Sequence, residues 1–393
     1  MLRQRWLWES LTEPGFQFLG IDFMQKNKYD VAAYIWPAYT GADKRANIFW
    51  PNGIGEWQTI QNAKPKFEGH DWPRKPLWGY VDEADPKVME QQIAAAVSHG
   101  VNVFIYDWYW YDHRPFLENC LNDGFLKAKN CQDMQFYLMW SNHDAVSVWD
   151  SRLSDRKNEP PVWLGAVDRA EFERIALRMI TKYFTQKNYY KINGEPVLMI
   201  YFLQNLITGL GGVEKAADAL NWFKRQVKKA GFPGLHLQAV KRSENYTYNA
   251  SGVDGGEPID ELSVITRLGF SSVTNYQFVH ITDVGKPYLQ VLAEIEKIWN
   301  LMEKFPLPYF PHVSIGWDNN PRHTELSQPI MTNCYPENFE KALCSAKEYL
   351  RKNQLPAPLV TVNSWNEWTE GSYLEPDEKF GYGFLQAIKN VFG

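Results

Sequence analysis

Apolar positions recur along the chain with two different periods. Short runs rich in β-branched and aromatic residues predict buried strands, and longer segments with an apolar residue at every third or fourth position predict amphipathic helices. The predicted strands are Asp30–Trp36, Asn102–Asp107, Phe136–Trp140, Pro196–Phe202, Leu235–Ala239, Ser272–Tyr276, Phe310–Gly316 and Leu359–Asn363. The predicted helices begin at or near Asp85, Asp168, Val213, Pro258, Pro287, Pro336 and Phe384.

Strands that alternate with helices pair in parallel, and eight such strands close a (β/α)8 TIM barrel. A doubly wound open sheet is the alternative fold. A glycine-rich phosphate loop after the first strand would favour it, but Gly53 and Gly55 lie deep in a loop that no helix follows. We interpret residues 1–393 as a single barrel domain in which residues 1–28 form an N-terminal extension. The segment Thr40–Ala84 lacks a helical period and predicts a long functional loop.

The composition favours some classes of partner and disfavours others. A net charge of −5 with no basic cluster argues against nucleic acid. Aromatic residues make up 15% of the chain, with 17 Trp and 21 Tyr. Stability alone seldom requires so many aromatic side chains, whereas surfaces that bind carbohydrate use them. We therefore expect a carbohydrate substrate and a monomeric protein.

Further patterns bear on cofactors and on the cellular compartment. Cys120, Cys131, Cys334 and Cys344 form no C-x-x-C pair, and the histidines form no H-x-H or H-E-x-x-H motif, so we expect no metal and no cofactor. No apolar stretch approaches the length of a membrane span. The first residues lack the apolar core of a signal peptide. This predicts a cytoplasmic protein for the sequence as written, and a periplasmic or secreted one if the sequence is trimmed.

The candidate chemistry lies directly after the last predicted strand. Glu367 and Glu370 are three residues apart and are interleaved with Trp365, Asn366 and Trp368. The carboxyl ends of barrel strands are where barrel enzymes place their active sites. Cleavage of a glycosidic bond needs two carboxyl groups around one bond, and sugar rings lie on flat aromatic faces. We therefore predict that Glu367 and Glu370 are catalytic.

Residues at other strand ends, in the long loop and around the glutamate pair are rich in Trp, carboxylates and amides. The predicted substrate-binding residues are Tyr34, Trp36, His70, Asp107, Trp108, Trp110, Trp140, Asn142, Tyr201, Tyr276, Trp317, Asp318, Asn319, Arg322, Trp365, Asn366, Trp368 and Glu375. Several have structural alternatives. Trp108 and Trp110 could plug the barrel top, and Asp318 could pair with Arg322. We expect His143 to be a hydrogen-bonded structural residue rather than a catalyst.

The motif N-E-W-T-E-G at Asn366–Gly371, followed by L-E-P, resembles the signature of glycoside hydrolase family 99 and its bacterial WbsX-like relatives. The resemblance to the WbsX-like branch covers most of the chain. It includes Tyr34–Tyr39, Phe67–His70, Tyr106–Trp110, Trp140–Asn142 and Trp317–Arg322. Only the segment with Glu367 and Glu370 also matches the characterised mannosidases.

The resemblance implies a retaining glycoside hydrolase that degrades polysaccharide. In it Glu367 would act as a base on the sugar's own 2-hydroxyl, through an anhydro-sugar intermediate, and Glu370 as general acid/base. Two alternatives stay open. The first is a glycosyltransferase of polysaccharide biosynthesis, the label that WbsX-like proteins often carry, although no D-x-D motif lies near a strand end. The second is a non-catalytic carbohydrate-binding barrel.

Overall fold

Eight parallel strands form the centre of the molecule. The structure is a computed structural model that describes residues 28–146, 149, 160–253 and 256–393. Within these residues the eight strands lie in the order β10-β7-β6-β4-β2-β1-β12-β11. The backbone of Val273 in β10 bonds to Pro308 and Phe310, 2.9 Å each, just ahead of β11. The sheet thus closes almost completely, which confirms the predicted (β/α)8 barrel. The predicted extension falls, except for Lys28, outside the described residues.

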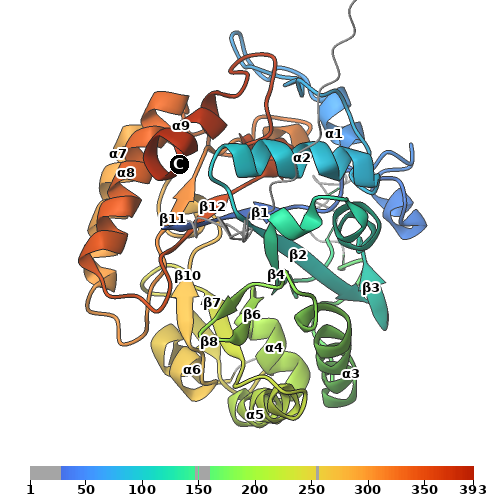
Figure 1. Cartoon of the computed structure of the whole chain (residues 1–393), viewed down its shortest axis with the longest axis vertical. Coiled ribbons are helices and arrows are strands. Elements are labelled where there is room, and N and C mark those ends of the chain that lie inside the picture. The colour runs from blue at the N-terminus through green and yellow to red at the C-terminus, as the bar shows by residue number, and fades with distance from the viewer. Residues whose placement is uncertain (1–27, 147–148, 150–159, 254–255) are drawn as a thin grey trace, which may run out of the picture.

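Helices surround the strands in the view of Figure 1. The barrel strands are β1 (Asp30–Ile35), β2 (Val103–Tyr111), β4 (Gln135–Trp140), β6 (Glu195–Ile200), β7 (His236–Val240), β10 (Ser272–Thr274), β11 (His312–Ser314) and β12 (Leu359–Asn363). Shorter strands are β3 (Arg114–Phe116), β5 (Lys191–Ile192), β8 (Thr247–Asn249), β9 (Pro258–Asp260), β13 (Asn366–Glu367) and β14 (Ser372–Tyr373). The described α-helices are α1 (Trp57–Asn62), α2 (Pro86–Ser98), α3 (Arg169–Met179), α4 (Leu203–Leu210), α5 (Val213–Lys229), α6 (Glu261–Arg267), α7 (Tyr288–Met302), α8 (Pro336–Lys352) and α9 (Gly383–Phe392).

Local sequence signals explain where several helices begin. The Asp85 carboxylate accepts a hydrogen bond from the Lys87 amide at 2.8 Å, and Pro86 occupies the first turn of α2. The Asp168 carboxylate accepts from the Glu171 amide at 2.8 Å in α3. Each cap satisfies one of the amides that a helix start leaves without a partner. The strand predicted at Leu359–Asn363 and the helix predicted at Pro336–Lys352 are found with those bounds.

Three local predictions were wrong. Strand β2 does not end at Asp107 but continues to Tyr111, because Tyr109, Trp110 and Tyr111 pair with the antiparallel β3. The long loop contains the short helix α1. The helix predicted from Pro258 begins only after Asp260, whose carboxylate caps it by accepting from the Ser263 amide at 2.9 Å.

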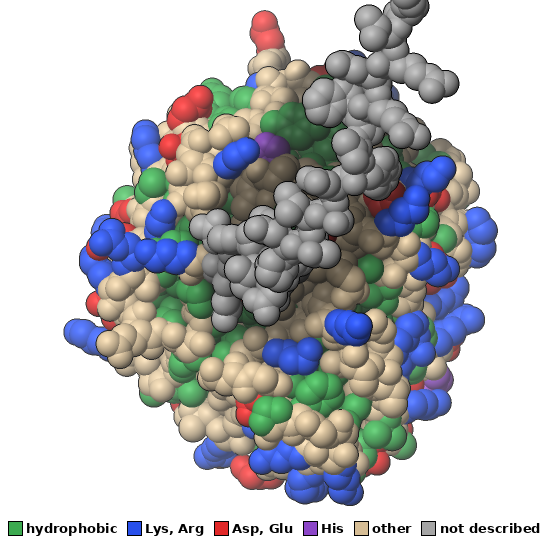
Figure 2. Space-filling model, viewed as in Figure 1, with side chains coloured by type: hydrophobic (Ala, Val, Ile, Leu, Met, Phe, Trp, Pro, Cys, Tyr) green, Lys and Arg blue, Asp and Glu red, His purple; other side chains and the backbone are tan. Residues whose placement is uncertain are grey.

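The described surface is mixed in charge. In Figure 2, Lys and Arg side chains are scattered around the edge of the face, interspersed with Asp and Glu. Among the described residues, every helix is too short or too polar to cross a bilayer.

Candidate active site

The predicted catalytic pair lies on a small hairpin that follows β12. Asn366 and Glu367 in β13 pair with Tyr373 and Ser372 in β14. Between them the chain makes a 3-10 turn, and Gly371 adopts the left-handed conformation at φ 63°. That turn places Glu367 and Glu370 on one short segment just past the carboxyl end of a barrel strand.

Asn366 fastens this hairpin to the neighbouring strand. Its side-chain amide donates to the Trp36 carbonyl at 2.8 Å, and its side-chain oxygen accepts from the Trp36 amide at 2.8 Å. The same amide donates to both oxygens of Glu83, at 2.9 and 3.0 Å. Because all these groups are buried, they are positioned by hydrogen bonds that water cannot replace. Asn366 is thus part of the support of the site rather than of its surface.

Arg322 connects three buried glutamates. Its guanidinium donates to Glu56 at 2.9 and 3.3 Å, to Glu370 at 3.0 Å and to Glu367 at 3.4 Å. The Trp36 indole also donates to Glu56, at 2.5 Å. Glu56 thus holds Arg322 through both of its oxygens and offsets much of its charge. Glu367 and Glu370 then share the part of the Arg322 charge that Glu56 does not offset.

A fourth carboxyl group, Asp107 at the inner face of β2, completes the group. The Tyr276 hydroxyl lies 2.7 Å from Glu367 and 3.2 Å from Asp107. One oxygen of Asp107 and one of Glu370 are shielded from solvent and have no hydrogen-bond partner among the described residues. Buried carboxylate oxygens normally have partners, so these two have unused acceptor capacity next to the cavity.

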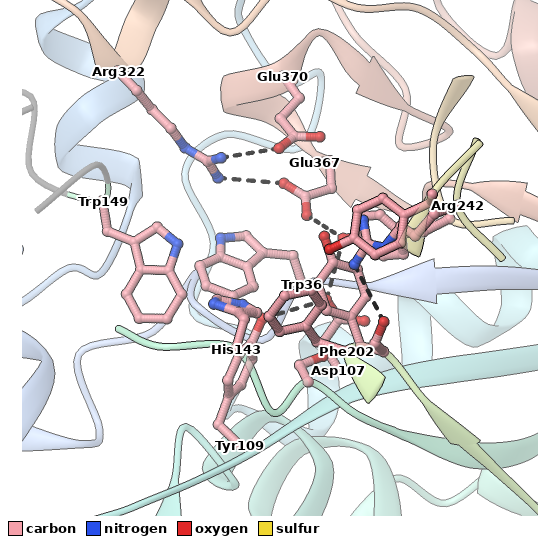
Figure 3. A pocket seen from close by; sticks show the side chains of 14 residues that line it. Trp36, Asp107, Tyr109, His143, Trp149, Phe202, Arg242, Arg322, Glu367 and Glu370 are labelled. Carbon is pink, nitrogen blue, oxygen red and sulfur yellow. Dashed lines mark hydrogen bonds and ion pairs between the residues drawn. The ribbon is translucent and has the colours of Figure 1, made fainter. Parts of the chain in front are cut away.

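These residues line a cavity of about 300 Å³. Figure 3 shows Glu367 and Glu370 beside Arg322, with Asp107 and the aromatic side chains around them. The lining consists of Trp36, Asp107, Tyr109, Ser141, His143, Trp149, Tyr201, Phe202, Arg242, Tyr246, Tyr276, Arg322, Glu367 and Glu370. Half of the lining residues are Trp, Tyr or Phe and the carboxyl groups are clustered, which suits a ring that packs on aromatic faces beside acid–base groups.

Burial changes the acidity of the lining groups. Burial, and next the Glu370 carboxylate, raise the pKa of Glu367 well above its ordinary value. Burial raises the pKa of Glu370 as well, with Arg322 opposing the shift. Burial likewise raises the pKa of Asp107. A low dielectric disfavours charged carboxylates, so this cluster retains protons at a pH where exposed glutamates have lost theirs.

His143 also lines the cavity, although it was expected to be structural. Its Nδ1 lies 2.9 Å from the Asp144 carbonyl. A carbonyl only accepts, so Nδ1 carries the proton and Nε2 is an acceptor. Burial lowers the pKa of His143 to about 4. The ring is therefore neutral near pH 7 and can accept a hydrogen bond from a ligand hydroxyl.

Several predicted substrate-binding residues lie behind the cavity wall. Successive side chains of a strand point to opposite faces, so the continuation of β2 turns Asp107 and Tyr109 inward. The Trp108 indole points the other way and donates to Glu118 at 2.8 Å. The Trp110 indole likewise donates to Glu171 at 2.6 Å. Neither of these tryptophans lines the cavity.

The other suggested pair, Asp318 with Arg322, is not formed. Asp318 instead lies 2.7 Å from His70 and accepts from the Trp72 indole at 2.6 Å. These contacts fasten the long loop to the segment after β11. Arg322 contacts the glutamates instead. It therefore lines the cavity, and Asp318 does not.

The remaining predicted residues divide in the same way. Trp36, Asp107, Tyr201, Tyr276 and Arg322 line the cavity with the glutamate pair. The residues that are absent from the lining and belong to its surroundings are Tyr34, His70, Trp108, Trp110, Trp140, Asn142, Trp317, Asp318, Asn319, Trp365, Asn366, Trp368 and Glu375. Asn142, for example, bonds to the Phe202 backbone at 2.8 and 2.9 Å, and Trp368 stacks on Tyr373 at 3.7 Å.

Sequence reasoning did not select several of the lining residues. Tyr109 would follow from the alternation of β2 once its true length is known. Arg242 follows β7 directly and meets the same strand-end rule as the predicted residues. Trp149 carries no local signal in the sequence. Within the described residues, no group of three or more His, Cys, Asp and Glu side chains is arranged to hold a metal ion.

Comparison with known proteins finds relatives that cover most of the chain. The chain matches the uncharacterized protein WxcX of Xanthomonas campestris pv. campestris with 27% identity over 350 residues, which is 88% of the chain and 47% of that protein. A second strain contains a relative that matches equally well. The chain therefore spans about half the length of the curated relatives it matches.

Two solved structures share the fold. A glycoside hydrolase-like protein superposes with a TM-score of 0.61 and 14% identity, covering 98% of this chain and 97% of the other. The family 99 endo-α-mannosidase of Bacteroides thetaiotaomicron, in complex with Bis-Tris propane, gives a TM-score of 0.57 and 11% identity, with 92% and 95% coverage. The sequence model of the family described as "Glycosyltransferase WbsX" matches residues 31–388. The chain belongs to this WbsX family, as the N-E-W-T-E-G motif led us to expect.

Proposed function

We propose that the chain is a glycoside hydrolase that cleaves glycosidic bonds in a polysaccharide or oligosaccharide with retention of configuration. The observation that carries this proposal is the buried pair Glu367 and Glu370, held by one arginine at an aromatic cavity. Two carboxyl groups around one bond are what such hydrolysis needs. The fold shared with glycoside hydrolases is compatible with it.

In the proposed reaction Glu367 takes the proton of the sugar's 2-hydroxyl while that oxygen attacks the anomeric carbon. Glu370 gives a proton to the leaving glycosidic oxygen. Water then opens the anhydro sugar: Glu370 takes a proton from the water, and Glu367 returns its proton to the 2-oxygen. The position of Glu370 in the cavity lining supports its role as the group that meets the leaving oxygen. The Tyr276 hydroxyl and Arg322 stabilise Glu367 when it is charged.

Both carboxyl groups of the pair have raised pKa values. Burial raises the pKa of Glu367 and that of Glu370, so the two groups titrate as a pair and either one could carry the proton. The proposed reaction requires it on Glu370 once the sugar is in place. The assignment of the two roles therefore needs a test of its own.

The first experiment asks whether the pair is needed. A panel of polysaccharides is incubated with the protein and the products are read by mass spectrometry. On a polymer that is cleaved, Glu367→Gln and Glu370→Gln should each lower kcat by at least about a hundredfold, the usual scale for a general acid or base. The exposed Glu68→Gln serves as the matched control. Near wild-type hydrolysis by either active-site variant, with folding checked by circular dichroism, would remove the mechanism.

A second experiment separates the roles. A glycosyl fluoride of the sugar that is released needs no proton on its leaving group. Glu370→Gln should therefore release fluoride in its first turnover far faster than it cleaves the polymer, whereas Glu367→Gln should be slow on both. The reverse pattern would exchange the two roles. Product anomers followed by NMR would show retention or inversion.

Glycosyl transfer is the second candidate, because the family's own description names a glycosyltransferase. The two activities differ in whether water or a sugar hydroxyl accepts the glycosyl group. Adding a candidate acceptor sugar to the hydrolysis assay tests this directly. Formation of a longer oligosaccharide from a nucleotide sugar, with no cleavage of any polymer, would favour transfer. Binding of polymers without either reaction would indicate a non-catalytic barrel.

A further inference from the structure

Two arginines line the cavity, and they differ in what surrounds them. Arg322 is held by three glutamates, as described above. Arg242 follows β7 and lines the same cavity, and Figure 3 shows it on the opposite side from Arg322. Among the described residues, no carboxylate forms a salt bridge with the Arg242 side chain.

The contacts of Arg242 leave most of its hydrogen-bonding capacity unused. Its Nη2 donates to the Tyr201 carbonyl at 3.2 Å, and its guanidinium lies over the Tyr201 ring at 4.5 Å and the Phe202 ring at 5.5 Å. Its Nε is shielded from solvent and has no hydrogen-bond partner among the described residues. A guanidinium carries five N–H donors, so this group is oriented by stacking and is incompletely paired.

Glu261, the carboxylate that contacts the backbone of Arg242, already has other partners. Glu261 accepts from the backbone amide of Arg242 at 2.9 Å and from the Tyr248 hydroxyl at 3.1 Å. Its other oxygen lies 3.2 Å from the Lys241 ammonium. Glu261 therefore neutralises Lys241 and not the Arg242 side chain, which leaves a positive charge at the cavity wall.

The position of the Arg242 charge indicates which sugar of the substrate it would contact. Both Arg242 and Arg322 lower the pKa of His143, after burial as the main cause, so His143 lies within electrostatic range of both. A cavity of about 300 Å³ is at the small end of ligand sites, which run from roughly 300 to 1,000 Å³. A sugar that contacts Arg242 is thus the reacting sugar or its immediate neighbour.

We propose that Arg242 recognises an oxyanion substituent on a sugar at or next to the scissile bond, so that the substrate is an acidic saccharide. A planar guanidinium matches the two oxygens of a carboxylate and those of a phosphate or sulfate ester. Without this charge, an anionic sugar would be repelled by the three carboxylates of the cavity. The inference rests on the proposed function, because it names the substrate class for the same site.

The first test measures binding alone. D-glucuronate, glucose 6-sulfate, glucose 6-phosphate, glucose and UDP are titrated into the wild-type protein, and intrinsic tryptophan fluorescence and melting temperature are followed. At least one anionic sugar should bind at least tenfold more tightly than glucose. Arg242→Gln should lose that preference, and Arg242→Lys, which keeps the charge without the fork, should retain part of it. Arg267→Gln is the matched control, since Arg267 is exposed and pairs with Glu214.

Each outcome decides the matter. The uronate, sulfate and phosphate arms identify which oxyanion the site prefers. Equal binding of glucose and all three anionic sugars would overturn the proposal, and so would equal losses of glucose and anion affinity in Arg242→Gln. Tighter binding of UDP than of every anionic sugar, dependent on Arg242, would assign the charge to a nucleotide-sugar donor instead.

A second test separates this inference from the proposed hydrolysis. An acidic polymer that is cleaved is compared with its carboxyl-reduced, neutral form. The ratio of kcat/KM for the two should exceed tenfold, and Arg242→Gln should lower that ratio to near one. Anion binding without cleavage of any polymer would remove the hydrolase and leave the anion site. Cleavage with no preference for the acidic form would remove the anion site and leave the hydrolase.

Discussion

Three glutamates around one arginine set the chemistry of the site at the scale of single residues. Arg322 is buried, and its pKa is raised despite burial because Glu56, Glu370 and Glu367 surround it. Buried charge pairs cost much desolvation energy and contribute little net stability. The arrangement holds two carboxyl groups with raised pKa values at the cavity.

The raised pKa values predict the pH dependence of the reaction. Glu367 must lose its proton to act as a base, and burial and Glu370 raise its pKa well above the ordinary value of 4.5. Activity should therefore fall as the pH drops through an apparent pKa that lies above 4.5, not near 4. The profile belongs to the coupled pair rather than to one residue. A kcat/KM profile measured from pH 3 to pH 9 checks this, and an acid limb at an ordinary glutamate pKa would contradict it.

At the scale of elements, the β13–β14 hairpin and the extended β2 strand determine which side chains reach the cavity. The hairpin is held by Asn366 and by Ser364, whose hydroxyl donates to the Ser372 carbonyl at 2.7 Å and accepts from the Glu367 amide at 2.7 Å. These bonds fix the backbone that carries Glu367. Strand β2 acts through alternation, since it directs Asp107 inward and Trp108 outward.

Asn366→Ala should disturb the hairpin without touching the substrate. The change removes the partner of the Trp36 amide and carbonyl and one of the donors to the Glu83 carboxyl, and each buried unpaired group costs about 1–3 kcal/mol. We expect a lower melting temperature and a fall in kcat that exceeds any rise in KM. Asn390→Ala, on the exposed face of α9, is the control. An unchanged kcat would show that Asn366 does not position Glu367.

Trp108→Ala should act on stability rather than on substrate binding. The indole is buried, bonds to Glu118 and stacks on Trp110 at 5.6 Å, so its loss leaves a cavity that costs about 3–5 kcal/mol. KM should stay near the wild-type value. Tyr246→Ala, which removes a half-buried ring from the cavity wall, should raise KM with little effect on melting. A rise in KM for Trp108→Ala but not for Tyr246→Ala would show that Trp108 belongs to the binding site.

At the scale of the whole molecule, a buried network joins the helix layer to the active-site hairpin. Gln92 in α2 donates to Glu375 at 2.6 Å and to Glu83 at 3.2 Å. Glu83 in turn accepts from Asn366. Burial raises the pKa of Glu83 to about 7 and that of Glu375 well above its ordinary value. Below about pH 7 the barrel therefore carries a protonated Glu83 beneath the candidate active site.

This network predicts how stability depends on pH. Between the ordinary pKa of 4.5 and the folded value of about 7, the folded protein holds a proton on Glu83 that the unfolded chain has released. Stability therefore falls as the pH rises through this window. Glu83→Gln should make the fall in melting temperature from pH 4.5 to pH 7.5 smaller, while Glu68→Gln should leave it unchanged. An equal or steeper fall in Glu83→Gln would contradict the assignment.

The sequence by itself was enough for the order of the eight barrel strands and for the place of the proposed catalytic pair. Periodicity and helix caps are local properties, so β12 and α8 could be located from a few neighbouring residues. The position of Glu367 and Glu370 after the last strand follows from the same local reading combined with the parallel topology of a barrel. The proposed base and acid were found in this way, and their roles stay a prediction.

Only the tertiary structure decided which side chains meet. Trp108 and Tyr109 have the same aromatic character in sequence, but the length and pairing of β2 turn one toward Glu118 and the other toward the cavity. Arg322 bonds to Glu56, which is remote in sequence, and not to its neighbour Asp318, because the long loop folds across the barrel end. Charge partners and cavity walls depend on distances between segments remote in sequence, and no local pattern encodes those distances. The sequence determined the barrel and its glutamates, and the packing of its loops decided what surrounds them.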